Sequence, residues 1–590
     1  MSRAKHRHIF SISHLLIFAL TYFPIFAMPV TVLANTMQVT MDDKGGASLS
    51  NGIVTMQIDN RGRVSSCVYE GTELVSPKNT WYFSYNTDKY HELMPSHWSI
   101  KTHTEEMIEV VYANESEGGI HWVQGWILRA GVSGIYTYVE AHGTEAETGI
   151  GEARMVYRLD DSMFNYGYIR EDLQGPMPQH ALMQQVATKA TTIQDATFLM
   201  PDSTIYTKYN WVDYLDEDHC HGILSENIGV WAMGLSREYV SGGPLKQDIL
   251  LHSDVKSTLL LQMFHSGHFG TAAPLFTQGM TKLYGPCFIY LNKGARAEMI
   301  ADARREAQVQ EAAWPMAWFE NAYYQTERKT VTGRIAITNK MQKVPMQVIL
   351  AQPGNPYSQG TDYMYWAKTD KNGRFTIKNV RPGTYTLHAY ALGGENTDEL
   401  TMNGLTVNGE GKMVNVGTIN WAPEKHGRLV WRIGEADRMT DGFGGWDLPR
   451  DYSNAKRSPL QQTYVIGKSK PADWYYVQCP KSEWSVVFDM KKIAGDSVYL
   501  TGTLAAISYL PVMKIEVNGE EVGEWVHWEC QADPSVYRSA TRSGYYQRMQ
   551  CVFPSSLLKK GENVITIRMP KLRRRGYGGV LWDCIKLEIE

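Results

Sequence analysis

The chain has 590 residues and a formal net charge of −4 at pH 7; 43% of its residues are hydrophobic and 20% are charged. This length predicts about three or four domains, each large enough to bury its own core. Because binding to nucleic-acid phosphates needs a basic surface, the slightly acidic balance disfavours a general nucleic-acid-binding protein.

The first 34 residues have the features of a secretory signal peptide. Basic residues without any acidic ones precede an apolar stretch from Ile9 to Val32, and the segment ends on Ala34. Pro24 and Pro29 interrupt the stretch, which disfavours a retained membrane anchor. We therefore expect cleavage after residues 1–34, a secreted or periplasmic mature protein, and no stable membrane insertion once the signal is removed.

Seven cysteines are spread along the chain without a CxxC motif. This excludes a zinc ribbon and a dense disulfide framework, and it predicts mostly buried thiols. Export leaves one or two disulfides open in the C-terminal part of the chain, and the spacing does not pair them. The cysteines are Cys67, Cys220, Cys287, Cys479, Cys530, Cys551 and Cys584.

Short β-type runs separated by Gly, Asn and Asp turns extend from Met37 to Leu291. The Ala-, Glu- and Arg-rich segment Ala295–Ala313 predicts a helix, and Pro315 follows it closely. We interpret the helix as the end of a large β-domain that covers residues 35–325.

After Thr326 the pattern of alternating strands and turns begins again and continues to Trp421. It predicts a small β-sandwich over residues 326–422. The remaining residues, 423–590, are rich in aromatic β-type runs and predict a jelly-roll sandwich of the carbohydrate-binding kind. The fold class is therefore all-β.

The segment Gly151–Leu159 (GEARMVYRL) predicts a strand. Period-2 alternation places Arg154, Val156 and Arg158 on one face, so two guanidiniums point the same way and suit carboxylate groups. The alternative is an exposed strand face with solvated arginines.

Lys208 lies among aromatic residues in the segment Tyr206–Trp211. A lysine near apolar rings or other cations has a lowered pKa and can act as a general base. The alternative is a surface lysine whose aliphatic stem lies along the aromatic rings.

His265 and His268 follow a buried-type strand. A spacing of three sends strand residues to opposite faces, so we expect one histidine to be structural and the other to face a cleft. The HSGH sequence lacks the helical HExxH context of zinc enzymes, so no metal site is predicted here. The acidic run Asp213–Asp218 lacks the EF-hand pattern, and a structural calcium ion there stays an open alternative to a solvated loop.

Taken in order, these segments resemble the rhamnogalacturonan endolyases of polysaccharide lyase family 4. The matching motifs are GEARMVYRL, TKYNW, SGGPLKQD, MFHSGHF, TDKNGRFTIKNVRPGTYTLHAY and WRIGEADR, and they extend over essentially the whole mature chain. The resemblance implies an N-terminal β-super-sandwich of the galactose-mutarotase type, a fibronectin type III-like domain and a C-terminal carbohydrate-binding-like jelly roll.

The resemblance also implies β-elimination in the backbone of rhamnogalacturonan I, between rhamnose and O4 of galacturonic acid. It assigns Lys208 as the catalytic base and His268 as the second catalytic residue. Residues expected to bind substrate are Arg154, Arg158, Tyr209 and His265. A monomer is expected, and the chemistry requires no metal or other cofactor.

Fungal members carry tyrosines on the strand before the catalytic histidine, where this chain has Leu261 and Met263. Sugar-stacking contacts are therefore not carried over to this strand. Two alternatives stay open: a non-catalytic carbohydrate-binding protein on the same scaffold, and a glycoside hydrolase that uses a carboxylate pair such as Asp216 and Glu217.

Overall fold

The computed structural model describes residues 37–115, 117–271, 273–451, 454–529 and 533–590. The expected signal peptide lies outside the described residues. Most of the regular elements are strands, as the turn-rich pattern predicts.

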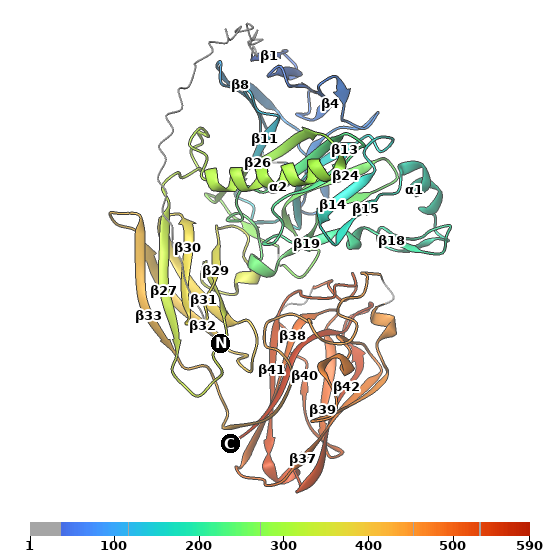
Figure 1. Ribbon diagram of the computed structural model, residues 1–590, viewed down its shortest axis with the longest axis vertical. Helices are drawn as coiled ribbons and strands as arrows, with labels where there is room; N and C mark the ends of the chain where they lie inside the picture. Colours follow the sequence, from blue (N-terminus) through green and yellow to red (C-terminus); the bar gives the residue numbers. More distant parts are fainter. Residues whose placement is uncertain (1–36, 116, 272, 452–453, 530–532) are drawn as a thin grey trace, which may run out of the picture. The chain divides into compact units, whose positions relative to one another are not determined.

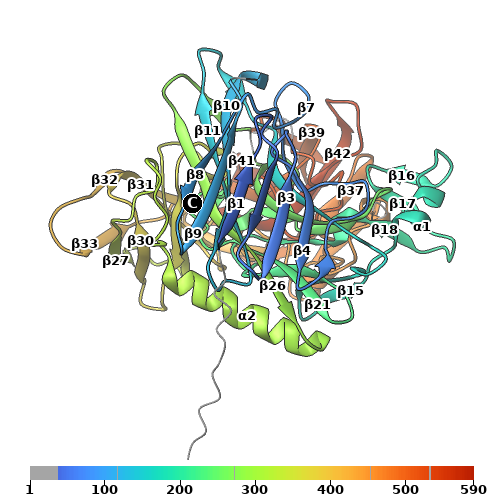
Figure 2. The ribbon, with the colours of Figure 1, turned by 90° about the horizontal axis from the view of Figure 1, so that it is seen from above.

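The N-terminal region is built on a nine-stranded sheet and two five-stranded sheets. The nine-stranded sheet has the order β15 (Leu173–Pro176), β14 (Tyr166–Arg170), β20 (His221–Leu224), β21 (Ile228–Met233), β26 (Thr281–Lys293), β11 (Gly134–Gly143), β10 (Ile120–Arg129), β9 (Met107–Ala113) and β8 (His97–His103). One five-stranded sheet has the order β23 (Leu251–Ser253), β24 (Thr258–Ser266), β13 (Glu152–Leu159), β6 (Tyr82–Asn86) and β7 (Tyr90–Glu92). The other has the order β1 (Gln38–Met41), β2 (Ala47–Ser50), β3 (Val54–Ile58), β4 (Val64–Tyr69) and β5 (Thr72–Glu73), and Figure 2 shows its strands in blue.

Smaller sheets carry the loops between these strands. They are β12 (Thr148–Gly149) with β25 (Leu275–Phe276), β16 (Thr192–Gln194) with β17 (Thr197–Leu199) and β18 (Ile205–Thr207), and β19 (Val212–Tyr214) with β22 (Gln247–Ile249). A short helix, α1 (His180–Val186), precedes β16.

One hydrophobic core joins the inner faces of the three large sheets. On β13, the residues Met155, Tyr157 and Leu159 enter this core, whereas Val156 belongs to a different buried cluster on the other face. Alternation on β13 therefore places Arg154 and Arg158 on the outer face, as the period-2 pattern predicts.

The helix α2 (Arg296–Ala313) follows β26, and it begins one residue after the predicted start at Ala295. Met299, Ala303 and Ala307 recur every four residues, and they pack on Trp231 of β21 and on other side chains from the outer face of the nine-stranded sheet. Figure 1 shows α2 as the long green helix lying against this region. It thus closes the face that the main core leaves uncovered.

The middle region is a sandwich of a three-stranded and a four-stranded sheet. The first has the order β30 (Arg374–Val380), β27 (Lys329–Ile337) and β33 (Met413–Trp421), and the second has the order β29 (Tyr365–Lys368), β28 (Met346–Ala351), β31 (Gly383–Ala391) and β32 (Glu399–Val407). The predicted boundary at residues 325/326 falls between α2 and β27.

The C-terminal region is a second sandwich. One sheet has the order β34 (Arg428–Gly434), β43 (Val580–Ile589), β38 (Ser497–Ile507) and β41 (Gln547–Pro554), with β36 (Val477–Gln478) also paired to β43. The other has the order β35 (Gln461–Val465), β37 (Ser482–Met490), β42 (Gly561–Leu572), β39 (Pro511–Val517) and β40 (Glu520–Trp525).

The described cysteines are free thiols, and five of these six are buried: Cys67, Cys220, Cys287, Cys551 and Cys584, with Cys479 partly buried. No disulfide therefore forms among them, and Cys530 lies outside the described residues. Within the described ranges, no helix has the length and apolar character needed to cross a bilayer.

Candidate active site

The candidate residues gather at one end of the sheet that contains β13 and β24. In this ladder Glu152 lies opposite Ser266, and a bulge follows before Arg154 pairs with Met263. The chain leaves β24 immediately after Ser266, so His268 lies in the loop beyond the strand. The sheet therefore brings the arginine strand and the histidine loop together.

Lys208 begins a short 3₁₀ helix, Lys208–Asn210, directly after β18. Its Nζ atom lies 3.0 Å from Oδ2 of Asp195, which comes from the turn between β16 and β17. The hydroxyl of Tyr209 donates to the same carboxylate at 2.8 Å. Burial alone would raise the pKa of Asp195, but the charge of Lys208 and these hydrogen bonds outweigh it, so the pKa lies below its usual value.

His268 is buried and is held through its Nδ1 atom. This atom lies 3.2 Å from Oδ1 of Asp248 and 3.1 Å from Oγ of Ser266. The Ser266 hydroxyl donates to Asp248 at 2.7 Å, so Nδ1 carries a hydrogen and Nε2 is left for a substrate. Burial lowers the pKa of His268 although the Asp248 carboxylate opposes this, so the neutral imidazole is favoured.

Asp248 is fully buried and is balanced by Lys246. The Nζ atom of Lys246 lies 3.7 Å from Oδ2 of Asp248 and also donates to the carbonyl of Ser266. Burial on its own would raise the pKa of Asp248, but Lys246 and the hydrogen bond from His268 hold it well below its usual value. Asp248 is therefore an ionised anchor for the histidine.

Arg154 forms an ion pair with Glu152 on its own strand. The pKa of His252 on β23 is lowered to about 4. Burial is the largest cause, followed by the charge of Lys208 and, more weakly, that of Arg154. The charges of Lys208 and Arg154 thus both reach His252.

Arg158 and His265 are buried, as His268 and Tyr209 also are. The guanidinium of Arg158 binds both carboxylate oxygens of Asp254, at 3.1 and 3.0 Å, and the hydroxyl of Ser257 at 3.2 Å. His265 is 1% exposed, and neither of its ring nitrogens has a hydrogen-bond partner among the described residues. The structure brings Lys208, Tyr209, His268 and Arg154 together, and Arg158 of β13 and His265 of β24 lie on the same pair of strands.

Several residues of the site have no local sequence signal. Asp195 lies in an ordinary turn, and Arg538 belongs to the C-terminal region. The Nη1 atom of Arg538 donates to the carbonyl of His268 at 3.1 Å, and its Cζ atom lies 5.8 Å from the Tyr209 ring centroid. Lys246 and Asp248 lie in the SGGPLKQD motif, which the sequence singles out only as a turn.

The two strand residues at the positions of the fungal tyrosines, Leu261 and Met263, are 1% and 5% exposed. They lie in the same buried cluster as Tyr209 and Phe269. Their side chains are therefore unavailable for stacking on a sugar.

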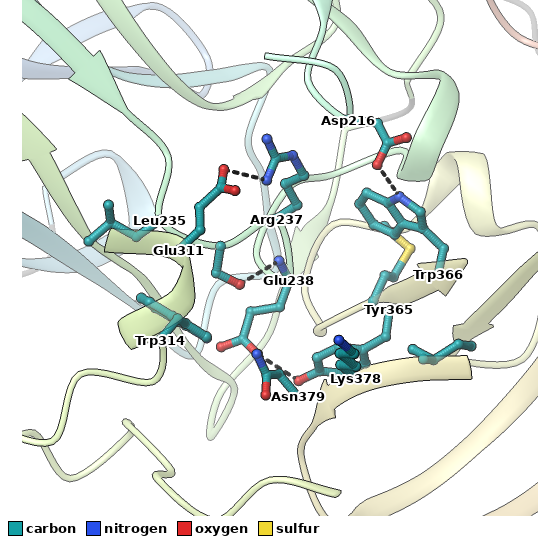
Figure 3. A pocket seen from close by; sticks show the side chains of 13 residues that line it. Asp216, Leu235, Arg237, Glu238, Glu311, Trp314, Tyr365, Trp366, Lys378 and Asn379 are labelled. Carbon is teal, nitrogen blue, oxygen red and sulfur yellow. Dashed lines mark hydrogen bonds and ion pairs between the residues drawn. The ribbon is translucent and has the colours of Figure 1, made fainter. Parts of the chain in front are cut away.

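A cavity of about 760 Å³ lies beside the site without including Lys208 or His268. It is lined by Trp211 and the neighbouring Thr207 and Asn210, and by Trp446 and Arg450 from the C-terminal region. A second cavity of about 220 Å³, drawn in Figure 3, lies where the N-terminal and middle regions meet.

The carboxylates of the Figure 3 pocket are already engaged. Asp216 accepts a hydrogen bond from the indole of Trp366 at 2.5 Å, and Glu238 accepts one from Tyr365 at 2.8 Å. Glu217 beside Asp216 is exposed. This arrangement gives no support to a hydrolytic carboxylate pair.

The acidic run Asp213–Asp218 is the segment for which a structural calcium ion stayed an alternative. Two of its carboxylates bind protein groups. Asp213 binds Arg170 at 2.8 Å, and Asp218 binds His221 at 2.8 Å. Across the described ranges, no group of three or more His, Cys, Asp or Glu side chains is arranged to hold a metal ion. The carboxylates of Asp213 and Asp218 are thus engaged by protein cations.

The sequence matches three protein-family profiles. Residues 40–304 match the N-terminal domain of rhamnogalacturonan lyase B, residues 327–415 match domain II of polysaccharide lyase family 4, and residues 429–587 match domain III of that family. The chain is 31% identical to the rhamnogalacturonate lyase of Dickeya dadantii, over 95% of this chain and 96% of the relative. It is 25% identical to rhamnogalacturonate lyase B of Emericella nidulans, over 80% of this chain and 83% of the relative.

Proposed function

The chain belongs to polysaccharide lyase family 4, and from this membership we propose that it is a rhamnogalacturonan lyase. The linkage cleaved is the rhamnose-(1,4)-galacturonic acid linkage in the backbone of rhamnogalacturonan I, at the bond between C4 and O4 of galacturonate. The reaction is a β-elimination that leaves a 4,5-unsaturated uronate at the new non-reducing end. This proposal rests on the relatives and on the residues gathered around Lys208.

The observation that carries the mechanism is the meeting of Lys208, His268 and Arg154 at one end of a sheet. The ring of Tyr209, next to Lys208, lies 6.1 Å from that of Phe269, next to His268. Lysine and histidine are both capable of proton transfer, and arginine binds carboxylates. This set of groups suits elimination from a uronate.

Lys208 is proposed to remove the proton from C5 of galacturonate. The electrons of the C5–H bond form the C4–C5 double bond, the C4–O4 bond breaks, and its electron pair leaves on O4 with the rhamnose. Because an ammonium cannot accept a proton, Lys208 has to be neutral when it reacts.

His268 is proposed to act on the O4 side of the bond. Asp248 and Ser266 fix its Nδ1 atom, so Nε2 is the atom that exchanges a hydrogen bond or proton with the leaving oxygen. Arg154 is proposed to bind the substrate beside His268. Tyr209 is proposed to line the substrate site between Lys208 and His268.

The test is the ultraviolet absorbance of the conjugated uronate, measured on rhamnogalacturonan I and on homogalacturonan, with and without a chelator. A rise on rhamnogalacturonan alone that survives chelation is the expected result. New reducing ends without absorbance would indicate a hydrolase, and neither signal would favour a binding protein.

We also propose that the mature protein is a monomer that is exported after removal of residues 1–34. N-terminal sequencing of the protein from the culture fluid or periplasm tests the cleavage, and light scattering tests the monomer. Recovery of the uncleaved chain in the membrane fraction would contradict the proposal.

A further inference from the structure

Elimination from a uronate requires a positive charge at the substrate carboxylate, because the C5 proton is lost from a sugar that is already anionic. The two arginines on β13 are each balanced by a protein carboxylate: Arg154 by Glu152 and Arg158 by Asp254. Lys246 is likewise balanced by Asp248. These pairs leave little net positive charge from the N-terminal region for a substrate carboxylate.

Arg538 supplies that charge from the C-terminal region. Within the described residues it forms no ion pair; its Nη1 atom donates only to the backbone carbonyls of His268 and Gly267, at 3.1 and 3.4 Å. Its Nε atom is buried and has no hydrogen-bond partner among the described residues. The guanidinium is thus tied to the histidine loop by one edge, and none of the described carboxylates lies within ion-pair distance of it.

Arg538 and Lys208 lie near the same aromatic ring. The Cζ atom of Arg538 is 5.8 Å from the centroid of the Tyr209 ring, and the Nζ atom of Lys208 is 5.3 Å from it. The positive charge of Arg538 also reaches Asp195. Burial raises the pKa of this carboxyl, whereas Lys208 and, more weakly, Arg538 lower it. A uronate whose C5 faces Lys208 therefore has Arg538 within reach of its carboxylate.

The loop that carries Arg538 is fixed to the N-terminal region. Ser543 accepts a hydrogen bond from the side chain of Gln247 at 2.8 Å and contacts the hydroxyl of Tyr214 at 3.1 Å. Gly270, two residues after His268, packs so closely that a Cβ atom there would lie 2.5 Å from the backbone nitrogen of Tyr545. Arg538 is therefore held in place before any substrate arrives.

A second arginine of the C-terminal region, Arg450, also approaches the site, with its Cζ atom 5.2 Å from the Phe269 ring centroid. Its guanidinium is held by Gln247, and burial lowers its pKa to about 10. Arg538 contacts the catalytic loop directly and is the better placed of the two.

We infer that Arg538, contributed by the C-terminal domain, binds the carboxylate of the galacturonate residue that undergoes elimination. This inference rests on the proposed function for its substrate class. It makes the third domain a part of the active site, in addition to any separate sugar binding by that domain.

Binding is tested in a Lys208→Ala background, where turnover does not consume the ligand. The probes are a rhamnogalacturonan oligosaccharide and its carboxyl-reduced form, in which galacturonate is converted to galactose. Adding Arg538→Ala is expected to weaken binding of the acidic oligosaccharide about 10- to 100-fold and to leave the reduced form nearly unchanged. Arg538→Lys, which keeps the charge and loses the planar fork, is expected to fall between the two.

Turnover by the otherwise wild-type enzyme gives the second readout. Arg538→Ala is expected to lower kcat/KM on rhamnogalacturonan about 100-fold. Arg574→Ala, which removes an exposed arginine of the same domain, is the matched control and is expected to leave kcat/KM unchanged.

An equal loss of affinity for the acidic and reduced oligosaccharides, or no loss for either, would overturn the inference. If the wild-type enzyme forms no unsaturated product, the proposed function fails, and the binding comparison still decides whether Arg538 recognises a carboxylate.

Discussion

The Nζ atom of Lys208 lies 3.0 Å from a carboxylate oxygen of Asp195, and the Tyr209 hydroxyl binds the same oxygen. The Lys208 side chain is 14% exposed, whereas that of Asp195 is 52% exposed. Asp195 therefore holds the side chains of the proposed base and of Tyr209 from the solvent side.

Replacing Asp195 with Asn is expected to lower kcat/KM on rhamnogalacturonan about tenfold, because Lys208 and Tyr209 lose the carboxylate that positions both side chains. The measurement is the rate of formation of the unsaturated product. Asp202→Asn, in the next exposed turn, is the control, and an unchanged kcat/KM for Asp195→Asn would contradict the positioning role of Asp195.

Lys208→Ala is expected to lower kcat at least about 1,000-fold, because the general base is lost. Binding of the oligosaccharide, measured by titration calorimetry, should largely survive. Lys189→Ala removes an exposed lysine nearby and serves as the control. Activity of Lys208→Ala within about tenfold of the wild type would rule out the assignment.

Asp248 is expected to make the protein sensitive to acid. Its pKa in the folded state lies well below the usual value of about 3.9, so its contribution to stability is fully present above that value. The contribution is lost as the pH falls from about 3.9 toward the folded-state pKa. Chemical denaturation between neutral and acidic pH measures it, and the same slope in Asp248→Asn would show that other carboxylates are responsible.

Glu238 is expected to be a principal anchor between the N-terminal and middle regions. It is 3% exposed and binds Arg381 at 2.8 Å and Arg328 at 3.2 Å. Glu238→Gln leaves two buried guanidiniums without a counter-charge and should cost about 3–5 kcal/mol of unfolding free energy.

Glu238 lines the pocket drawn in Figure 3, and urea denaturation measures the cost of replacing it. Glu327→Gln is the control, because Glu327 pairs with Lys329 from a position that is 65% exposed. Equal unfolding midpoints for the two variants would show that the buried contacts of Glu238 contribute little.

Much of the fold follows from local patterns in the sequence. Alternation along Glu152–Leu159 predicts a strand with Arg154 and Arg158 on one face, and this is confirmed. The Ala- and Glu-rich composition of Ala295–Ala313 predicts the bounds of α2 closely, and the helix buries one stripe of Met299, Ala303 and Ala307. Both predictions depend only on neighbours a few residues apart.

The partners of the site residues do not follow from such patterns. Asp195 reaches Lys208 through a turn between short strands, and Asp254 reaches Arg158 from the end of β23. Arg538 is separated from His268 by 270 residues along the chain. These contacts are products of tertiary packing, and no periodicity in the sequence encodes them.

The outer face of the sheet that carries β24 shares one buried cluster with the core of the C-terminal sandwich. Leu261 and Met263 lie in this cluster with Trp431 and Trp582. A chain truncated before residue 423 would present this face to water and would invite aggregation. The C-terminal region is therefore not an independent module. A chimera that replaces it has to provide a surface that fits the outer face of the β24 sheet.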